Sequence, residues 1–233
     1  MIEISELKRQ LQAMGDASAV QGMARFGIAS QDAYGVSIPK LRTLGKELGT
    51  NHELAQQLWR EKNRELKILA GLIEDPQAVT ESQMESMVQE FYDWEICDQT
   101  IMNVFEKTPY AYDKATQWCV RDELFVRRAG FVLMARLAVS DKRAENERFV
   151  AFFSYIKTGA ADERALVKKA VNWALRQIGK RNLELHTMAL AVAEELQEQE
   201  GKSARWIASD ALRELRSEAV LQRLQKKREK NRT

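Results

Sequence analysis

The sequence predicts an all-α chain of stacked antiparallel helix pairs. Apolar residues recur at helical spacing along almost the whole length, and no run alternates as a strand would. Only 3 prolines and 11 glycines occur among 233 residues, and neither type gathers into a linker. Hydrophobic residues make up 45% of the chain, which is enough for a continuous core. We therefore expect short helices joined by short turns in a single domain over residues 1–233.

Helices are expected in order along the chain, interrupted by one clear loop from Gly27 to Gly35. The expected ranges are 3–14, 17–26, 38–48, 52–60, 63–74, 80–90, 93–105, 109–119, 122–138, 143–157, 161–178, 182–198, 202–215 and 217–228. Pro39 and Pro109 stand near two expected starts. A first-turn proline is tolerated because its missing N–H would have no helical partner.

Self-similarity in the second half indicates a repeat. The segment LFVRRAGFVLMARL begins at Leu124, and the related segment ALVKKAVNWALRQI begins at Ala165. Ala129, Ala170 and Ala211 follow one another at intervals of 41 residues. A period near 40 built from helix pairs is typical of HEAT-type repeats. These stack into a solenoid, and we expect its concave surface to accept a long ligand.

The charge is unevenly distributed, although the net charge is only +2. Residues 1–120 hold 12 basic and 18 acidic side chains, whereas residues 121–181 hold 14 basic and 7 acidic ones. Residues 201–233 hold 10 basic and 4 acidic ones. Two basic blocks on a nearly neutral protein indicate a localised anion-binding surface. Residues 217–233 form either a basic C-terminal helix or a frayed, solvated tail.

The sequence gives little support for a membrane protein or for a metal-binding protein. No stretch approaches the roughly 18 apolar residues of a membrane span, and the N-terminus lacks the apolar core of a secretory signal. Cys97 and Cys119 lie too far apart for a CxxC motif, and His52 and His186 are isolated. We expect two buried thiols in a cytoplasmic protein, with no metal site.

The segment from Tyr92 to Gln99 differs in composition from a plain core helix. Trp94 and Asp98 stand four residues apart and so share one helical face. An acid one turn from an aromatic ring is common on ordinary helices, so the pair by itself leaves both a structural and a functional role open.

Paired cations recur in register in the second half. Arg127–Arg128 and Lys168–Lys169 occupy the same repeat positions, 41 residues apart. Trp173 and Arg176 share a face of the later helix. A row of cations along one surface matches a phosphate backbone. The alternative is a set of solvated helix faces with Trp173 packed in the core.

Taken together, these residues resemble the AlkD family of DNA alkylation repair glycosylases. The resemblance runs from Met23 to about residue 216 and rests on Trp94-x-x-x-Asp98, on Arg128 before an Ala-led apolar stripe, and on Trp173-x-x-Arg176. It implies HEAT-like repeats around duplex DNA and hydrolysis of the N-glycosidic bond of cationic purines such as 3-methyladenine and 7-methylguanine, in base excision repair.

The resemblance also implies roles for individual residues. Trp94, Asp98 and Trp173 would form the catalytic site at the sugar of the lesion, whereas Arg128 and Arg176 would hold the nearby DNA backbone. Lys169, Arg127 and Lys168 belong to the same basic register. The family has Met-Ala-Arg-Tyr where this chain has Met-Ala-Arg-Phe, so Phe26 keeps the ring at an expected DNA contact but lacks the phenol.

The residue types suit this chemistry without a cofactor. A carboxylate such as Asp98 can stabilise an oxocarbenium-like sugar and align a water, and indole faces add cation–π attraction. The resemblance implies a monomer whose partner is double-stranded DNA containing alkylated purines, and a protein that is associated with the nucleoid while it acts. The main alternative is a non-catalytic HEAT-like scaffold that grips DNA or protein. An RNA-binding repeat protein would repeat its stacking aromatics once per unit, and the 5 Trp residues do not.

Overall fold

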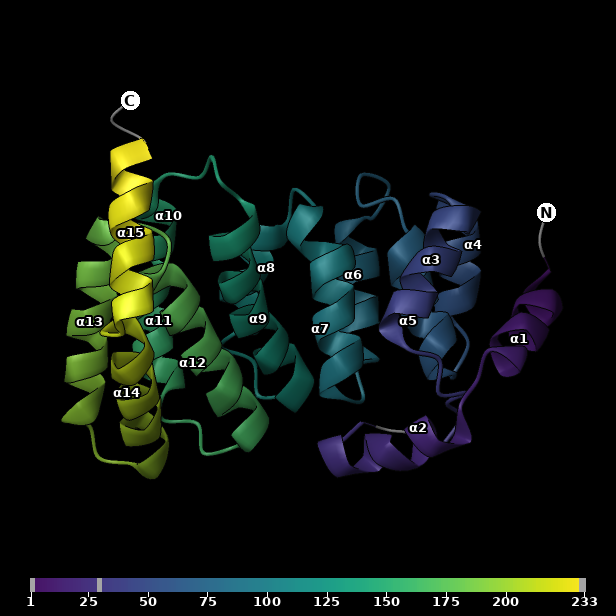
Figure 1. The fold of residues 1–233 in the computed structure, drawn as a ribbon, viewed down its shortest axis with the longest axis horizontal. Coiled ribbons are helices and arrows are strands. Elements are labelled where there is room, and N and C mark those ends of the chain that lie inside the picture. Colours follow the sequence, from purple (N-terminus) through teal and green to yellow (C-terminus); the bar gives the residue numbers. More distant parts are fainter. Residues whose placement is uncertain (1–2, 29–30, 231–233) are drawn as a thin grey trace. The chain divides into compact units, whose positions relative to one another are not determined.

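The computed structural model describes residues 3–28 and 31–230, and every regular element in these ranges is helical. The chain folds into two compact units, unit 1 (Met1–Pro109) and unit 2 (Tyr110–Thr233). Figure 1 shows the helices of each unit packed side by side. The predicted class of an all-α, HEAT-like arrangement of stacked helix pairs is confirmed. The expectation of one continuous domain stays a prediction.

Unit 1 packs its core around α5, which lies against α3, α4 and α7. Its elements are α1 (Ile4–Ala13), α2 (Ala17–Met23), η1 (Ala24–Phe26), α3 (Ile38–Leu48), α4 (His52–Trp59), α5 (Arg64–Ile73), α6 (Glu81–Gln89), α7 (Trp94–Asn103) and η2 (Phe105–Lys107). Side-chain caps explain several of the starts. Asn51, Asn63, Thr80 and Asp93 each accept a bond from a backbone N–H of the first turn.

Unit 2 consists of two packed layers (Figure 1). Its elements are α8 (Ala111–Trp118), α9 (Leu124–Ser140), α10 (Asn146–Val150), α11 (Phe152–Gly159), α12 (Ala165–Gly179), α13 (Leu183–Gln197), α14 (Lys202–Leu215) and α15 (Glu218–Lys230). Helix α12 lies between α9 and α14, and it packs against α11 and α13 on its other side. The face shared by α9, α12 and α14 is therefore built by the segments that carry the sequence repeat.

The repeat is visible in the polar contacts of unit 2. Ala129, Ala170 and Ala211, which mark the 41-residue period, are all buried. Side-chain hydrogen bonds join residues 38 positions apart again and again, namely Arg128–Leu166, Asn146–Glu184, Lys157–Glu195, Asn172–Asp210 and Arg176–Glu214. A recurring separation of this kind means that each repeat contacts the next in the same way.

Two details differ from the expected elements. The helix expected over 143–157 is divided at Ala151 into α10 and α11. Phe149 and Phe152, on either side of the break, both pack against the ring of Tyr112, with centroids 6.3 and 6.0 Å away. The spacing of apolar residues along the chain does not reveal such tertiary packing, so the break at Ala151 could not be predicted from it. Pro109 precedes α8 by two residues, so it lies outside the first turn.

The described C-terminal residues form a packed helix. Val220 and Leu224 of α15 are buried, so this segment is no frayed tail up to Lys230. Residues 231–233, and residues 29–30 of the expected Gly27–Gly35 loop, lie outside the described residues. Both cysteines are buried and neither forms a disulfide. No described helix has the length and apolar character needed to cross a membrane.

Candidate functional site

Helix α7 of unit 1 carries the predicted tryptophan and carboxylate at its start. Asp93 caps this helix by accepting a hydrogen bond from Ile96 N–H at 2.8 Å. Trp94 is the first helical residue and is half-buried, whereas Asp98, one turn later, is 9% exposed. The i, i+4 spacing places both side chains on one face of α7. This carboxylate therefore lies in largely desolvated surroundings near an indole.

The Trp94 indole is held by the short helix η1. Its Nε1 donates a hydrogen bond to the Phe26 carbonyl oxygen at 2.8 Å. Phe26 is followed by Gly27, whose φ of 69° ends η1 in the left-handed region that favours glycine. The Phe26 ring itself is 72% exposed. The main chain of Phe26 thus orients Trp94 while its ring stays available at the surface.

A buried ion network fixes the first turn of α7 to the rest of unit 1. Arg64 donates from Nε and Nη2 to the two carboxylate oxygens of Glu95, at 2.6 and 2.8 Å. Arg64 also donates to Glu65, whose carboxylate accepts the backbone N–H groups of residues 34–36. Burial disfavours the Arg64 charge, but the bonds to Glu95 and Glu65 outweigh it and raise the pKa of Arg64.

This network was not predicted from the sequence. A signal was present, because an Asn-Arg-Glu run opens α5 at positions where a core helix would carry apolar residues. Arg64, Glu65 and Glu95 are all buried, and a buried charge persists only with a partner. The network fastens the first turn of α7, which carries Trp94 and Glu95, to α5.

Unit 2 contains a hollow of about 430 Å³ formed by α9, α12 and α14. Its lining residues are Arg128, Lys169, Asn172, Trp173, Arg176, Trp206 and Asp210. Four predicted residues meet here, because Arg128, Lys169, Trp173 and Arg176 come from the two helices that carry the repeat. Trp173 is half-buried and lines the hollow, while its neighbours Ala174 and Leu175 fill the core.

The cations of the hollow differ in their partners. Lys169 is exposed and has no ion pair within the described residues. Arg176 pairs with Glu214 and, at 3.6 Å, with Asp210. Burial disfavours the charge of Glu214, but Lys180 and Arg176 outweigh it and lower the pKa of Glu214. Arg128 is buried and donates to the Leu166 carbonyl oxygen at 2.7 Å, so its guanidinium also joins α9 to α12.

The remaining cations of the basic register lie beside the hollow. Lys168 Nζ stands 5.1 Å from the ring centroid of Trp206. Arg127 is half-buried and pairs with Asp162 at 3.4 Å. Arg127 does not line the hollow. Contact of either residue with DNA stays a prediction.

Three lining residues were not singled out from the sequence. Trp206 is 40% exposed and adds a second indole to the hollow. Asn172 Nδ2 donates to Asp210 Oδ2 at 2.6 Å, which joins α12 to α14. The repeat register could have indicated this wall, because Ala211 of α14 follows Ala170 of α12 at the same 41-residue interval.

The predicted site residues are divided between the two units. Phe26, Trp94 and Asp98 belong to unit 1, and Trp173 belongs to unit 2 with all the predicted cations. Their roles in catalysis and binding stay predictions. Over residues 3–28 and 31–230, no group of three or more His, Cys, Asp or Glu side chains is arranged to hold a metal ion.

Comparison with known proteins adds a family and a fold. The model of a family described as DNA alkylation repair enzyme matches residues 7–215. No curated protein matches the chain. A solved structure, described as a new family related to the HEAT-like repeat DNA glycosylases with affinity for branched DNA structures, is similar at 19% identity and a TM-score of 0.76. That likeness covers 91% of this chain and 95% of the other.

A designed armadillo repeat protein is a more distant match, with 15% identity, a TM-score of 0.38 and coverage of 92% of this chain and 95% of that chain. Only the first structure therefore supports the fold, and at its level of identity it supports the fold alone.

Proposed function

We propose that this chain, which belongs to the DNA alkylation repair enzyme family, is a DNA glycosylase that removes cationic alkylated purines from double-stranded DNA. The observation that carries the proposal is the start of α7. There, a largely buried carboxylate, Asp98, shares a helical face with Trp94, whose indole is fixed by a hydrogen bond to Phe26.

The reaction needs little beyond charge stabilisation and a water. In an N3- or N7-alkylated purine the base is already cationic, so the C1′–N bond breaks with its electron pair leaving on the base, which becomes neutral. The sugar is left as an oxocarbenium ion. Water then adds to C1′ and loses a proton, which Asp98 can accept. The products are the free methylated base and an abasic sugar.

Asp98 acts in this scheme mainly through its charge. A carboxylate about 4 Å from a cation gains roughly 4 kcal/mol at an effective dielectric near 20. Trp94 would add about 0.5–2 kcal/mol by cation–π attraction to the developing sugar cation. Labile, cationic lesions such as 3-methyladenine and 7-methylguanine are therefore the substrates we propose.

The hollow of unit 2 supplies the proposed backbone contacts. Lys169 is an exposed cation without an ion pair among the described residues, and Arg176 and Arg128 stand next to it. The carboxylates of Asp210 and Glu214 hold Arg176 in place in the absence of DNA. A phosphate that approaches Arg176 would compete with these two carboxylates for the guanidinium. Only a phosphate in the right position would win that competition, so the two acids favour correctly placed DNA over loosely bound DNA.

The test is single-turnover excision from methylated duplex DNA by the Asp98→Asn variant. We expect folding and most DNA affinity to persist while excision falls by roughly 10²-fold or more, the usual effect of removing a preorganised transition-state charge. Asp113→Asn, at an exposed position of α8, is the matched control and should excise normally. Wild-type rates in Asp98→Asn would exclude Asp98 as the catalytic carboxylate.

A non-catalytic DNA-binding protein is the second candidate. The similar solved structure is described as having affinity for branched DNA, although that statement concerns the other protein. This candidate predicts no base release by the wild-type protein and tighter binding to a four-way junction than to a linear duplex. Base release from methylated linear duplex by the wild-type protein, lost in Asp98→Asn, would exclude it.

A further inference from the structure

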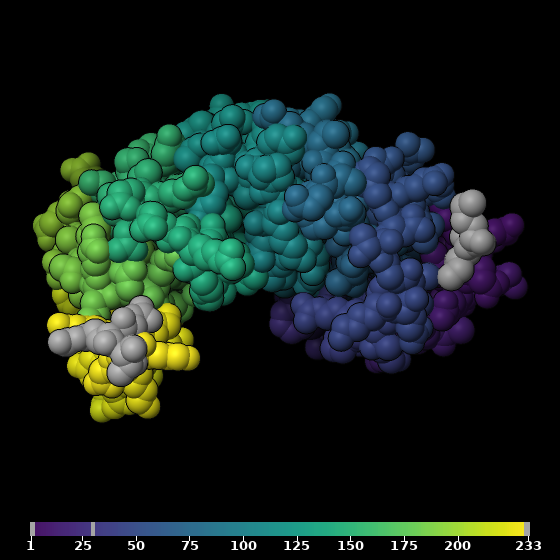
Figure 2. Space-filling model, turned by 90° about the horizontal axis from the view of Figure 1, so that it is seen from above, coloured from purple at the N-terminus to yellow at the C-terminus, as the bar shows by residue number. Residues whose placement is uncertain are grey.

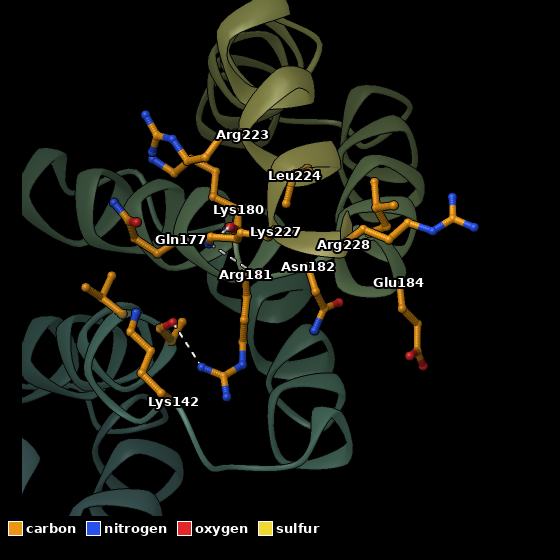
Figure 3. A pocket seen from close by; sticks show the side chains of 13 residues that line it. Lys142, Gln177, Lys180, Arg181, Asn182, Glu184, Arg223, Leu224, Lys227 and Arg228 are labelled. Atoms are coloured by element: carbon orange, nitrogen blue, oxygen red, sulfur yellow. Dashed lines mark hydrogen bonds between the residues drawn. The ribbon is translucent and has the colours of Figure 1, made fainter. Parts of the chain in front are cut away.

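A second cavity of unit 2 is strongly basic and lies apart from the hollow. It measures about 1020 Å³ and is lined where the ends of α9 and α12 and the start of α13 meet α15 (Figure 3). We call it the basic pocket. Its cations are Lys142, Lys180, Arg181, Arg223, Lys227 and Arg228. Glu184 is the one acidic lining residue among the described residues, and it accepts a hydrogen bond from Asn146.

Helix α15 forms one wall of the basic pocket and is firmly placed within unit 2. Its Val220 and Leu224 are buried, and α15 packs on α13 and α14. Figure 2 shows the yellow C-terminal residues protruding from the green surface of this unit. Lys227 Nζ donates to the Lys180 carbonyl oxygen at 3.0 Å, so α15 caps the C-terminal end of α12. The pocket is therefore a built feature and not a chance gathering of tail residues.

Three of the six cations are already engaged. Lys180 pairs with Glu214. Arg181 donates to the carbonyl oxygens of Asp141 and Ala144, at 2.6 and 2.7 Å. Lys227 caps α12. These interactions of Lys180, Arg181 and Lys227 shape the pocket.

The other three cations have no fixed role in the fold. Lys142, Arg223 and Arg228 form no ion pair with any described residue, and all three line the basic pocket. In Figure 3 Lys142 and Arg223 lie on one side of α15, whereas the Arg228 side chain extends toward the other side. Partial burial and the charges of Lys142, Arg223 and Arg181 lower the pKa of Lys227. The positive charges thus lie close enough to repel one another, which is a state that an anion would relieve.

We propose that the basic pocket binds phosphates of a DNA backbone outside the lesion contact. The proposal rests on the proposed action on DNA, and it follows from the continuity of α12. Arg176 of the hollow and Lys180 of the basic pocket stand four residues apart, about 6 Å along the helix axis. Duplex DNA carries one charge per roughly 1.7 Å of its axis, so a duplex at the hollow brings further phosphates within reach of the pocket.

The lining favours a backbone over a free nucleotide. No aromatic side chain of the described residues lines the basic pocket, so a base would find no ring on which to stack. Its apolar lining residues are limited to Ala138, Val139, Leu183 and Leu224. The unpaired cations come from the turn that follows α9 and from two turns of α15, so they can contact separate phosphates.

The test compares the salt dependence of binding to undamaged duplex DNA of about 24 base pairs, a probe that requires no excision. In the triple variant Lys142→Gln, Arg223→Gln, Arg228→Gln we expect the slope of log K against log salt to fall by about 2.7, since each phosphate contact contributes about 0.9. Wild type would then lose about 40-fold more affinity than the variant between roughly 50 and 200 mM salt. The matched control removes three other cations of unit 2, Arg143→Gln, Lys202→Gln and Arg205→Gln, and should keep the wild-type slope.

A charge-retaining variant and a second DNA probe distinguish a lost phosphate contact from a folding defect and from a contact with another DNA arm. The charge-retaining variant Lys142→Arg, Arg223→Lys, Arg228→Lys should restore the slope, which a folding defect would not allow. If the triple variant lowers the slope equally on linear duplex and on a four-way junction, the contacted phosphates belong to the bound duplex itself. If it lowers the slope on the junction alone, the phosphates belong to a second arm of the junction and the proposed placement is overturned. A slope that falls by less than about one, or equally in the control, overturns the proposal. Because DNA binding and excision are scored separately, a failure of this proposal can be distinguished from a failure of the proposed function.

Discussion

Single residues in unit 2 illustrate how position decides between a structural and a functional role. Trp173 shares α12 with Ala170, Val171, Ala174 and Leu175, and those four are buried. The Trp173 indole is half-buried and lines the hollow instead. The core of α12 is thus complete without this ring. Its size and rigidity remain available to a ligand.

Trp173→Ala is therefore expected to melt within a few degrees of wild type while excision of 7-methylguanine falls by roughly 2- to 30-fold. This fold-change is the ratio of rates that corresponds to a lost cation–π attraction of about 0.5–2 kcal/mol. Differential scanning calorimetry and single-turnover excision are the measurements. Trp206→Ala, which removes the other indole of the same hollow, is the matched control and should lower excision less. A large drop in melting temperature with a fully active folded fraction would return Trp173 to the core.

At the scale of elements, close approach between helices depends on small residues. Gly130 lies on α9 where that helix meets the end of α8. A Cβ atom at this position would stand 2.7 Å from the α-carbon of Cys119 and 2.9 Å from the Ala115 carbonyl oxygen. Both are backbone atoms, so they cannot move aside as a flexible side chain would. The α8–α9 pair can pack in this way only if residue 130 has no side chain.

We expect Gly130→Ala to destabilise the protein by about 1–3 kcal/mol, although alanine is the better helix former. Urea unfolding of the full chain measures the change. Gly22→Ala on α2 is the matched control, because a Cβ there meets nothing within 4 Å. It should leave stability unchanged or raise it by up to about 1 kcal/mol. Equal midpoints for Gly130→Ala and wild type would contradict the packing argument.

At the scale of the whole molecule, carboxylates of unit 2 link stability to pH. Burial disfavours the charged forms of Asp141, Asp162 and Glu214, but their bonds outweigh it and lower all three pKa values. The main partners are Tyr112 for Asp141, Arg164 for Asp162 and Lys180 for Glu214. A carboxyl whose pKa is lower in the folded state stabilises the fold above its unfolded pKa, near 4, and loses that effect as pH falls.

We therefore expect the free energy of unfolding to be constant from neutral pH down to about pH 5 and to decrease below about pH 4. The double variant Asp162→Asn, Glu214→Gln should be less stable than wild type at neutral pH but should lose less stability between about pH 4 and pH 2. Thermal unfolding at a series of pH values gives both quantities. Identical acid limbs for the two proteins would show that these carboxylates titrate alike in the folded and unfolded states.

The sequence by itself determined the helical class, the order of the elements and the repeat of unit 2. Those features depend on local periodicity and on residues such as Ala129 and Ala170, whose spacing is written along the chain. It also selected Trp94 and Asp98 as neighbours, because residues four apart on one helix share a face.

Only the tertiary structure decided which distant side chains meet. The hydrogen bond from Trp94 to Phe26 joins residues 68 positions apart, and the Arg64–Glu95 pair joins two separate helices. Trp206 enters the hollow, and α15 completes the basic pocket, only when repeats stack. Such contacts depend on how helices pack, and a one-dimensional pattern does not encode which side chain from another helix reaches a given position. The residue types of the candidate site can therefore be read from local sequence patterns, whereas its geometry depends on the tertiary structure.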